Sequence, residues 1–375
     1  MTKRAARHLF AIGVGVGVAS LGGCSLLTDV SGLSQPTADA DAARSLDANV
    51  DRDATIPNVP DGGKPTSFLV WAGGANSTAA GSGPSAEILI ARVNDDGSLA
   101  EWKRGPDLPL ALYRHSVVSV DGHVYVLGGG DSPQTAASSH VFDVALTADG
   151  TATVTTAASA LPLDISDACA ASANGRIYAK DYAGTRLAFA QVSGGKLGGW
   201  KMSALTSDVE LYGAAAAGPT GIYVTGATAK SMRRLPLGAT FEPTETVWQA
   251  ASDAPRVANI SIAQSPLVSH GGFLYLVGTF ADTGEQEARV FGSPLAGGAS
   301  LTWQEMEPFV GLRHAHSAAA VSGFLYVAGG YGSNGEKDVA YAAILPGGRL
   351  GLWQGTTPMP SGRVGTCQLA AVTVP

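Results

Sequence analysis

The segment GHVYVLGGG (residues 122–130) recurs as GFLYVAGG (residues 323–330), and weaker copies lie before and between these two. The central position of each copy is a valine or a tyrosine: Val70, Tyr125, Tyr178, Tyr223, Tyr275 and Tyr326. These positions follow one another at intervals of roughly 50 residues, a period that indicates a stacked or circular array of one small unit. The chain of 375 residues therefore contains six copies of that unit.

A second marker, a tryptophan that follows a glycine-rich turn, keeps the same period. DGSLAEW ends at Trp102, GGKLGGW at Trp200 and GGRLGLW at Trp353. Within a unit, four short apolar segments are separated by turn dipeptides such as Asp121-Gly122, which favour tight hairpins. Four strands in ~45–50 residues are typical of a propeller blade. We expect the tyrosine and tryptophan rings to pack between blades rather than to hold a ligand.

The pattern Arg-x-x-His…Gly-x-x-Tyr-Val-x-Gly-Gly…Trp…Pro resembles the Kelch repeat. It is clearest at Arg313, His316, Gly323, Tyr326, Gly329, Gly330, Trp353 and Pro360. The resemblance covers residues 66–375 through divergent copies. It implies an all-β fold, a six-bladed β-propeller of Kelch type with four-stranded antiparallel blades.

The two ends of this region are each incomplete. The last segment, GRVGTCQLAAVTVP (residues 362–375), matches the opening strand of a unit, but the rest of that unit does not follow. The first segment, SFLVWAGG (residues 67–74), has no opening strand before it. We expect the C-terminal strand to complete the N-terminal blade, because that closure removes the exposed edges of an open array.

Cys169 and Cys367 occupy matching positions in the opening strands of two units that are two blades apart. Equivalent positions separated by a third of a turn should lie beyond the ~7 Å Cα separation that a disulfide tolerates. The sequence therefore predicts two free, largely buried thiols.

The first residues are typical of a targeting segment. Lys3, Arg4 and Arg7 precede a short apolar run at residues 9–21, and Leu-Gly-Gly-Cys ends at Cys24. This order resembles the lipobox of bacterial lipoproteins, which implies a signal peptide at residues 1–23 and acylation of Cys24. Two or three acyl chains would hold the protein stably to a lipid bilayer. The alternative is an ordinary secretory signal in which the cysteine is incidental.

Residues 24–65 are predicted to be a flexible acidic linker. The segment after Cys24 is rich in aspartate, has no aromatic residue and shows no apolar period, so it cannot bury enough surface to order itself. Asp-x-Asp spacings at 39/41 and 51/53 could suggest calcium, but the glycine and glutamate of a calcium loop are missing. Ser25, rather than aspartate, after the cysteine predicts sorting to the outer membrane in a Gram-negative host of the enterobacterial kind.

Composition and motifs exclude several classes of function. The net charge is −7 and no basic stripe occurs, so nucleic acid is not an expected partner. The patterns G-x-S-x-G, H-E-x-x-H, the Walker loop and C-x-x-C are absent from the sequence. His314 and His316 would share one side of a strand, yet Kelch repeats commonly carry this histidine without metal. We therefore predict neither a cofactor nor a metal.

The predicted blades place two kinds of connection on one side of the ring, named here the loop face. These are the links between blades and the longer loops at residues 75–85, 131–139, 280–286 and 331–337. The other side, the turn face, carries short glycine-rich turns. Because binding residues concentrate on loops held by a rigid scaffold, we expect a ligand over the axial opening of the loop face. The candidates are Arg114, His115, Asp167, Glu210, Arg256, Arg313, His314, His316 and Arg363.

Two functions fit this pattern. The first is a non-enzymatic binding or scaffold protein, anchored at the cell envelope, whose propeller binds a protein or a glycan. The second is a carbohydrate-active enzyme, such as a sugar epimerase or lyase, with its site at the propeller axis. The copper site of the Kelch-type galactose oxidases has no matching constellation here. Acid, base and arginine side chains converging on the axis would favour the enzyme, whereas Kelch repeats also use arginine and histidine structurally.

Overall fold

The computed structural model describes eleven stretches of the chain: residues 64–76, 83–131, 137–166, 169–207, 213–225, 231–253, 260–261, 265–281, 286–295, 300–332 and 337–375. Residues 53–375 form one compact unit. The predicted signal peptide, Cys24 and most of the predicted linker lie outside the described residues. Among the stretches described, no helix is long and apolar enough to cross a membrane.

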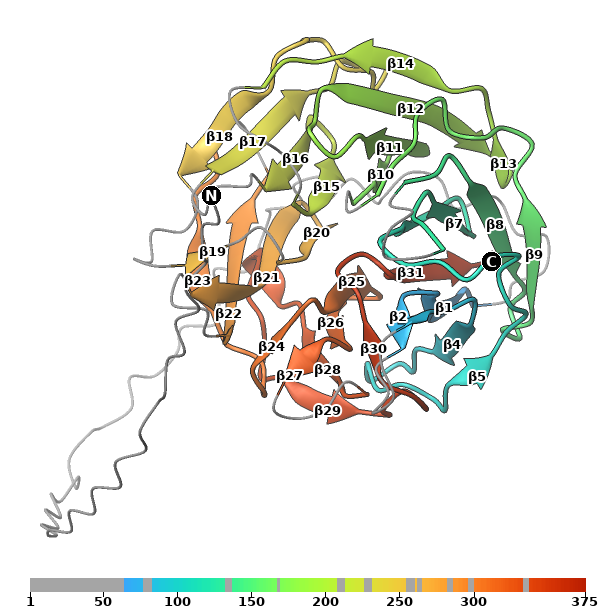
Figure 1. Ribbon diagram of the computed structural model, residues 1–375. Helices are drawn as coiled ribbons and strands as arrows, with labels where there is room; N and C mark the ends of the chain where they lie inside the picture. Colours follow the sequence, from blue (N-terminus) through green and yellow to red (C-terminus); the bar gives the residue numbers. More distant parts are fainter. Residues whose placement is uncertain are drawn as a thin grey trace, which may run out of the picture. The chain divides into compact units, whose positions relative to one another are not determined.

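Most of the described strands form six antiparallel sheets arranged as blades around one axis (Figure 1). Blade 1 contains β31 (Leu369–Val374), β1 (Thr66–Ala72), β4 (Ile88–Arg92) and β5 (Lys103–Arg104). Blade 2 contains β6 (Ser116–Val120), β7 (His123–Leu127), β8 (Val141–Leu146) and β9 (Ala152–Thr156). Blade 3 contains β10 (Ala171–Ala173), β11 (Arg176–Lys180), β12 (Arg186–Ser193) and β14 (Lys201–Ala204), with β13 (Lys196–Leu197) beside β12.

The remaining three blades repeat the arrangement. Blade 4 contains β15 (Ala215–Gly218), β16 (Gly221–Thr225), β17 (Ser231–Pro236) and β18 (Gln249–Asp253). Blade 5 contains β20 (Leu267–His270), β21 (Phe273–Ala281), β22 (Gln286–Pro294) and β23 (Gln304–Met306), with β19 (Ile260–Ser261) beside β21. Blade 6 contains β25 (Ser317–Val321), β26 (Phe324–Ala328), β28 (Val339–Ala343) and β29 (Gln354–Thr356), and the short helix η1 (Pro346–Gly348) joins its last two strands.

Tight hairpins join the first two strands of several blades. In blade 2 the turn residues Asp121 and Gly122 both have positive φ, 52° and 76°. Asn174-Gly175 in blade 3 and Ser322-Gly323 in blade 6 repeat this conformation. Two consecutive positive φ values define the hairpin turn whose twist matches that of the flanking strands, which confirms the predicted turn dipeptides.

The marker tyrosines and tryptophans hold neighbouring blades together from both sides. Each of four tyrosines donates its hydroxyl to a backbone carbonyl of the next blade: Tyr125 to Gly195, Tyr178 to Phe241, Tyr275 to Gly348 and Tyr326 to Gly97. Each of four tryptophans donates its indole N–H to a carbonyl of the preceding blade: Trp102 to Thr357, Trp200 to Ser159, Trp248 to Gly184 and Trp353 to Glu307. A ring that fills the wedge between sheets thus also satisfies its polar atom. The predicted core role of these aromatics is confirmed.

Blade 1 is built from both ends of the propeller, as predicted. Strand β31 pairs antiparallel with β1 from Thr66↔Val374 to Trp71↔Leu369. The first strands of the six blades, β31, β6, β10, β15, β20 and β25, contact one another in turn around the axis. The ring is therefore closed, and its innermost strands carry no open edge.

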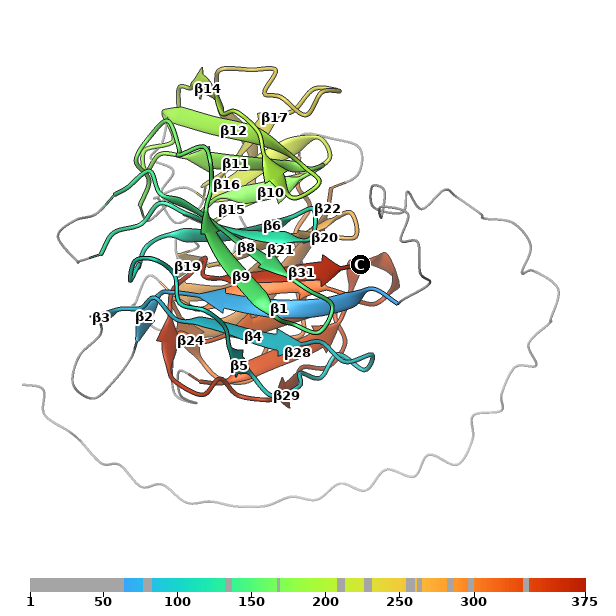
Figure 2. The same cartoon turned by 90° about the vertical axis from the view of Figure 1, so that its right-hand side faces the viewer.

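The two faces differ in the predicted way. Two small sheets extend the loop face: β2 (Ala75–Asn76) pairs with β3 (Gly83–Pro84) and β30 (Arg363–Val364), and β24 (Arg313–His314) pairs with β27 (Tyr331–Gly332). Figure 2 shows β2, β3 and β24 at one face and the C-terminus at the other. Since Thr66 pairs with Val374, the propeller also begins at this second side, the turn face.

Candidate functional site

Four of the nine candidate residues lie in the interior of the propeller. The exposed fractions are 2% for His115, 1% for His316, 3% for Arg313 and 0% for Arg363. Their side chains therefore serve the fold, which is the structural role that the sequence left open for them. Asp167, Glu210 and Arg256 lie outside the described residues.

The two buried histidines join consecutive blades. His115 Nε2 lies 2.7 Å from the carbonyl oxygen of Ala72, and His316 Nε2 lies 3.0 Å from that of Val277. Burial lowers the pKa of His115 to about 4 and that of His316 to about 3, so both rings are neutral at pH 7 and donate an N–H to these carbonyls. The two rings lie at different joints, a joint being the contact between two adjacent blades. His115 lies between blades 1 and 2 and His316 between blades 5 and 6, so the two rings cannot share one metal ion.

Glycine makes room for each of these rings. A Cβ placed on Gly73 would lie 2.7 Å from Cε1 of His115, and one on Gly278 would lie 2.5 Å from Cε1 of His316. Both glycines also have positive φ, 61° and 73°. The glycines of the repeated segment are therefore required by the close approach of the next blade's histidine as well as by the backbone.

The two buried arginines fasten loops to the ring. Arg313 Nη1 donates to the carbonyls of Gly329 and Asp338, at 3.2 and 3.0 Å. Arg363 forms an ion pair with Glu87, which precedes β4 in blade 1. Burial lowers the pKa of Arg363 to about 10, so its charge persists at neutral pH and is balanced by the glutamate. Arg363 therefore links the C-terminal segment to the N-terminal blade.

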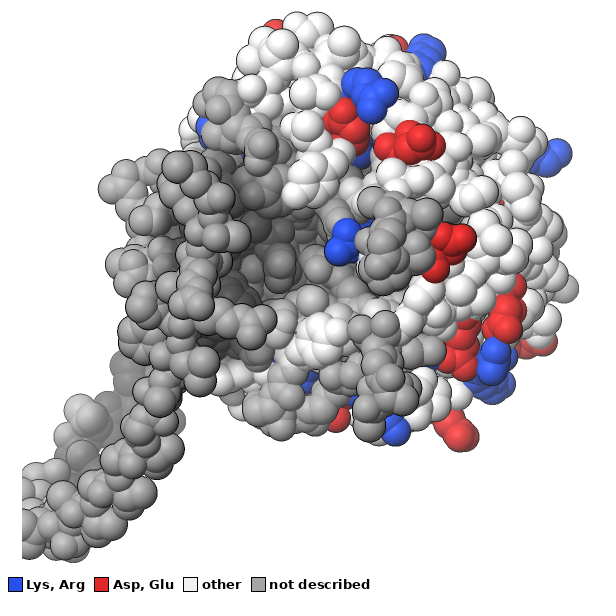
Figure 3. All heavy atoms as spheres, viewed as in Figure 1, with Lys and Arg blue, Asp and Glu red and all other residues white. Residues whose placement is uncertain are grey.

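Two candidates remain accessible on the loop face. Arg114 is exposed, and its guanidinium carbon lies 5.1 Å from the centre of the Tyr113 ring. His314 is half-buried, and its ring centre lies 5.3 Å from that of Tyr331. Arg114 has a φ of 59°, and Ala315 at the equivalent point of blade 6 has a φ of 49°. Figure 3 shows charged side chains of both signs scattered over this face rather than gathered into a patch of one sign.

A narrow axial cavity of about 150 Å³ runs between the innermost strands. Its lining consists of alanine, serine, valine and leucine: residues 117–119, 170–172, 215–217, 267–269, 318–320 and 369–371. None of these side chains can act as a general acid or base. The cavity wall in the described part of the chain thus lacks the converging charged cluster that the enzymatic alternative needs. Nor do the described residues contain a group of three or more histidine, cysteine, aspartate or glutamate side chains able to hold a metal.

Cys169 and Cys367 form a disulfide, so the prediction of two free thiols is wrong. Their Cα atoms are 5.7 Å apart. The two cysteines do not occupy equivalent positions after all. In blade 6 Ser317 pairs with Ala328, which precedes Gly329. In blade 1 Trp71 pairs with Leu369, and the N–H of Ala72, which precedes Gly73, donates to the carbonyl of Gln368.

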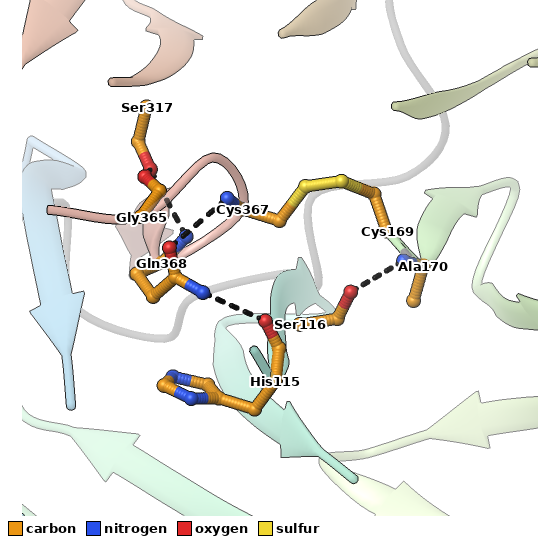
Figure 4. The surroundings of a disulfide bond; sticks show 8 residues. All are labelled: His115, Ser116, Cys169, Ala170, Ser317, Gly365, Cys367 and Gln368. Carbon is orange, nitrogen blue, oxygen red and sulfur yellow. Dashed lines mark hydrogen bonds between the residues drawn. A yellow bond between two sulfur atoms is a disulfide. The ribbon is translucent and has the colours of Figure 1, made fainter. Parts of the chain in front are cut away.

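Gln368 therefore takes the place of Ser317, and Cys367 lies one residue earlier, in the turn that leads to β31. Figure 4 shows the bridge from this turn to the residue before Ala170. Close to the propeller axis the blades lie near one another. The shift of one residue therefore brings the two Cα atoms within disulfide distance, although their blades are a third of a turn apart.

Hydrogen bonds surround the disulfide and repeat from blade to blade (Figure 4). Ser116 Oγ in blade 2 accepts the N–H of Ala170 in blade 3, at 2.6 Å. Ser317 Oγ in blade 6 accepts the N–H of Gln368 in blade 1, at 3.0 Å. Gln368 Nε2 in turn donates to the carbonyl of His115, at 2.9 Å. A serine at the start of an innermost strand thus fixes the strand of the following blade.

The sequence reasoning missed a buried lysine. Lys180 is 2% exposed and occupies the place taken by Leu127 in blade 2 and Ala328 in blade 6. Burial lowers its pKa to about 7, while neighbouring Asp181 opposes that shift. The signal was present as a lysine at an apolar position of the repeat, in RIYAKD (residues 176–181).

These features define a closed six-bladed β-propeller whose joints use backbone carbonyls as acceptors for tyrosine, tryptophan and histidine. The family model of the Kelch motif matches residues 111–144, which hold His115, the first two strands of blade 2 and most of the third. The chain is therefore a Kelch-repeat β-propeller. No curated protein matches it.

Proposed function

We propose that this propeller is a binding scaffold of the cell envelope, held to a membrane through acylated Cys24, with a protein partner bound on the loop face. The Kelch-propeller fold is consistent with a protein-binding scaffold. The observation that carries the proposal is the position of the chain's entry: β1 begins at Thr66 beside Val374, on the turn face. A tether that enters there leaves the loop face and its variable loops directed away from the attachment.

The disulfide supports export from the cytosol. Such bonds form and persist in oxidising compartments and are rare where thiols are kept reduced. Cys169–Cys367 joins residues 198 positions apart in the sequence. Together with the lipobox-like segment that ends at Cys24, it supports a location outside the cytosol.

Replacement of Cys24 tests the anchor. Cys24→Ser removes the only thiol that the lipobox could acylate, so the protein should move from the detergent-soluble membrane fraction to the soluble or secreted fraction. Ser25→Ala is the matched control and should stay with the membrane. Unchanged partition of Cys24→Ser would refute the anchor.

Site-directed photo-crosslinking tests the face. A photoreactive amino acid at position 114 should form adducts with an envelope protein in intact cells, because Arg114 is exposed on the loop face. The control position is 349, since Arg349 is exposed near the turn between β28 and β29 on the turn face. Adducts from 349 but not from 114 would show that the face is wrongly assigned.

A further inference from the structure

The disulfide lies at the loop-face end of the axial cavity. Cys169 directly precedes Ala170, and Cys367 precedes Leu369 by two residues; Ala170 and Leu369 both line the cavity. Between them, the N–H of Val117 in blade 2 donates to the carbonyl of Cys367 at 2.8 Å. The bridge therefore runs from blade 1 to blade 3 past the end of blade 2, along the rim of the cavity.

Closure of the ring does not depend on this bond. The ladder between β31 and β1 covers the whole of β31, and β30 pairs with β2. The ion pair between buried Arg363 and half-buried Glu87 adds a second link between the two ends of the propeller. What the disulfide adds is local: it holds the turn at residues 365–367 against blade 3.

The two sulfur atoms differ in their surroundings. Cys169 is buried and Cys367 is half-buried, so an incoming thiolate reaches Cys367 more easily.

We propose that Cys169–Cys367 is a redox-controlled clasp, opened by thiol–disulfide exchange with a dithiol partner, that governs access to the axial cavity while the ring stays closed. This inference does not depend on the proposed function. A thiolate of the dithiol attacks Sγ of Cys367, the disulfide breaks, and Cys169 leaves as a thiolate that takes up a proton. The second thiol of the partner then attacks the mixed disulfide, which releases Cys367 as a thiol and leaves the partner as a disulfide.

Alkylation and hydrogen exchange test the clasp together. The full chain would be expressed in an exporting bacterial host with Cys24→Ser, so that Cys169 and Cys367 are its only cysteines. Without reductant, alkylation should add nothing to the intact mass, and after dithiothreitol it should add two adducts. Reduction should raise amide exchange at residues 364–369 and 169–171 by about tenfold, because local opening sets this rate. Exchange in β1 should not change.

The double variant Cys169→Ser/Cys367→Ser is the matched control. It should show the faster exchange at residues 364–369 from the start and should not respond to dithiothreitol. Two adducts without reductant would overturn the inference, since the bond would not form. Equal exchange in the oxidised and reduced proteins would also overturn it. Faster exchange along the whole of β1 after reduction would mean that the bond closes the ring, which contradicts a local clasp.

Discussion

Blade 1 and blade 2 have the same four-stranded architecture but are assembled differently. Blade 2 takes its strands from one continuous segment, from β6 to β9, whereas blade 1 joins β31 to strands that lie some 300 residues earlier in the chain. Blade 1 is also fastened by the ion pair of Arg363 with Glu87, which joins the C-terminal segment to the N-terminal strands. In blade 1, whose strands come from the two ends of the propeller, a side-chain contact thus reinforces the sheet.

Removal of the closing strand β31 from blade 1 should have the largest effect on stability. Deletion of residues 364–375 leaves β1 with an unpaired edge and uncovers the core beneath Val372 and Ala370. We expect aggregation or loss of the cooperative thermal transition, because a bare edge and an apolar face are exposed together. Circular dichroism melting and light scattering measure this. A truncated protein that melts like the intact chain would refute closure through blade 1.

The ion pair of blade 1 should give the next largest effect. Arg363→Met leaves Glu87 without its buried partner, and we expect a loss of about 2–4 kcal/mol in the free energy of unfolding. Arg104→Met is the control, since Arg104 lies 3.5 Å from the same glutamate but is largely exposed; it should cost less than about 1 kcal/mol. Denaturant titration measures both. Equal losses in the two variants would contradict the role assigned to Arg363.

Acid should weaken the joint between blades 1 and 2 through His115. Its folded pKa of about 4 lies below the ordinary value of 6.5, so its contribution is complete above pH 6.5 and is lost as the pH falls toward 4. At pH 5 the loss should be about 2 kcal/mol. His115→Gln keeps an N–H donor for Ala72 without titrating, so its stability should fall less between pH 7 and pH 5. Identical pH profiles for the two proteins would contradict the assignment.

The smallest effect should come from single tyrosine hydroxyls. Tyr326→Phe removes a bond from blade 6 to Gly97 of blade 1, and Tyr125→Phe removes the equivalent bond from blade 2 to Gly195 of blade 3. Each should cost about 1 kcal/mol. Similar losses would show that the joint next to the closing blade is held like any other. A much larger loss for Tyr326→Phe, measured by the same titration, would show that the contact between blades 6 and 1 is weaker than the contact between blades 2 and 3.

The sequence was sufficient to predict the ring, because the repeated tyrosines and tryptophans keep the same phase. An aromatic side chain that fills the wedge between blades has to recur once per blade. The spacing of these residues therefore indicates the size and the number of the blades. The roles of His115, Arg313 and Arg363 could not be separated in this way. The same side chain can project into solvent or turn inward to a carbonyl, and only the course of the neighbouring loop decides which.

The disulfide was missed for a different reason. Aligning Arg363 with Arg313 places Cys367 level with Ser317, but the paired strands show that Gln368 is the true match, one residue further on. Far from the axis such an error would matter little. At the cavity rim, where blades converge, one residue decides whether two sulfur atoms can meet.

Since Thr66 pairs with Val374, the first and last residues of the propeller lie side by side in one sheet. The ring is thus a circular object that happens to be cut within blade 1. A short peptide joining residue 375 to residue 66 would remove that cut, and new ends could be opened at the exposed turn around Gly271 and Gly272, where added side-chain atoms would meet nothing. In such a permuted chain blade 5, instead of blade 1, would be assembled from the two ends of the propeller. Blade 5 would then need side-chain contacts that hold those two ends together.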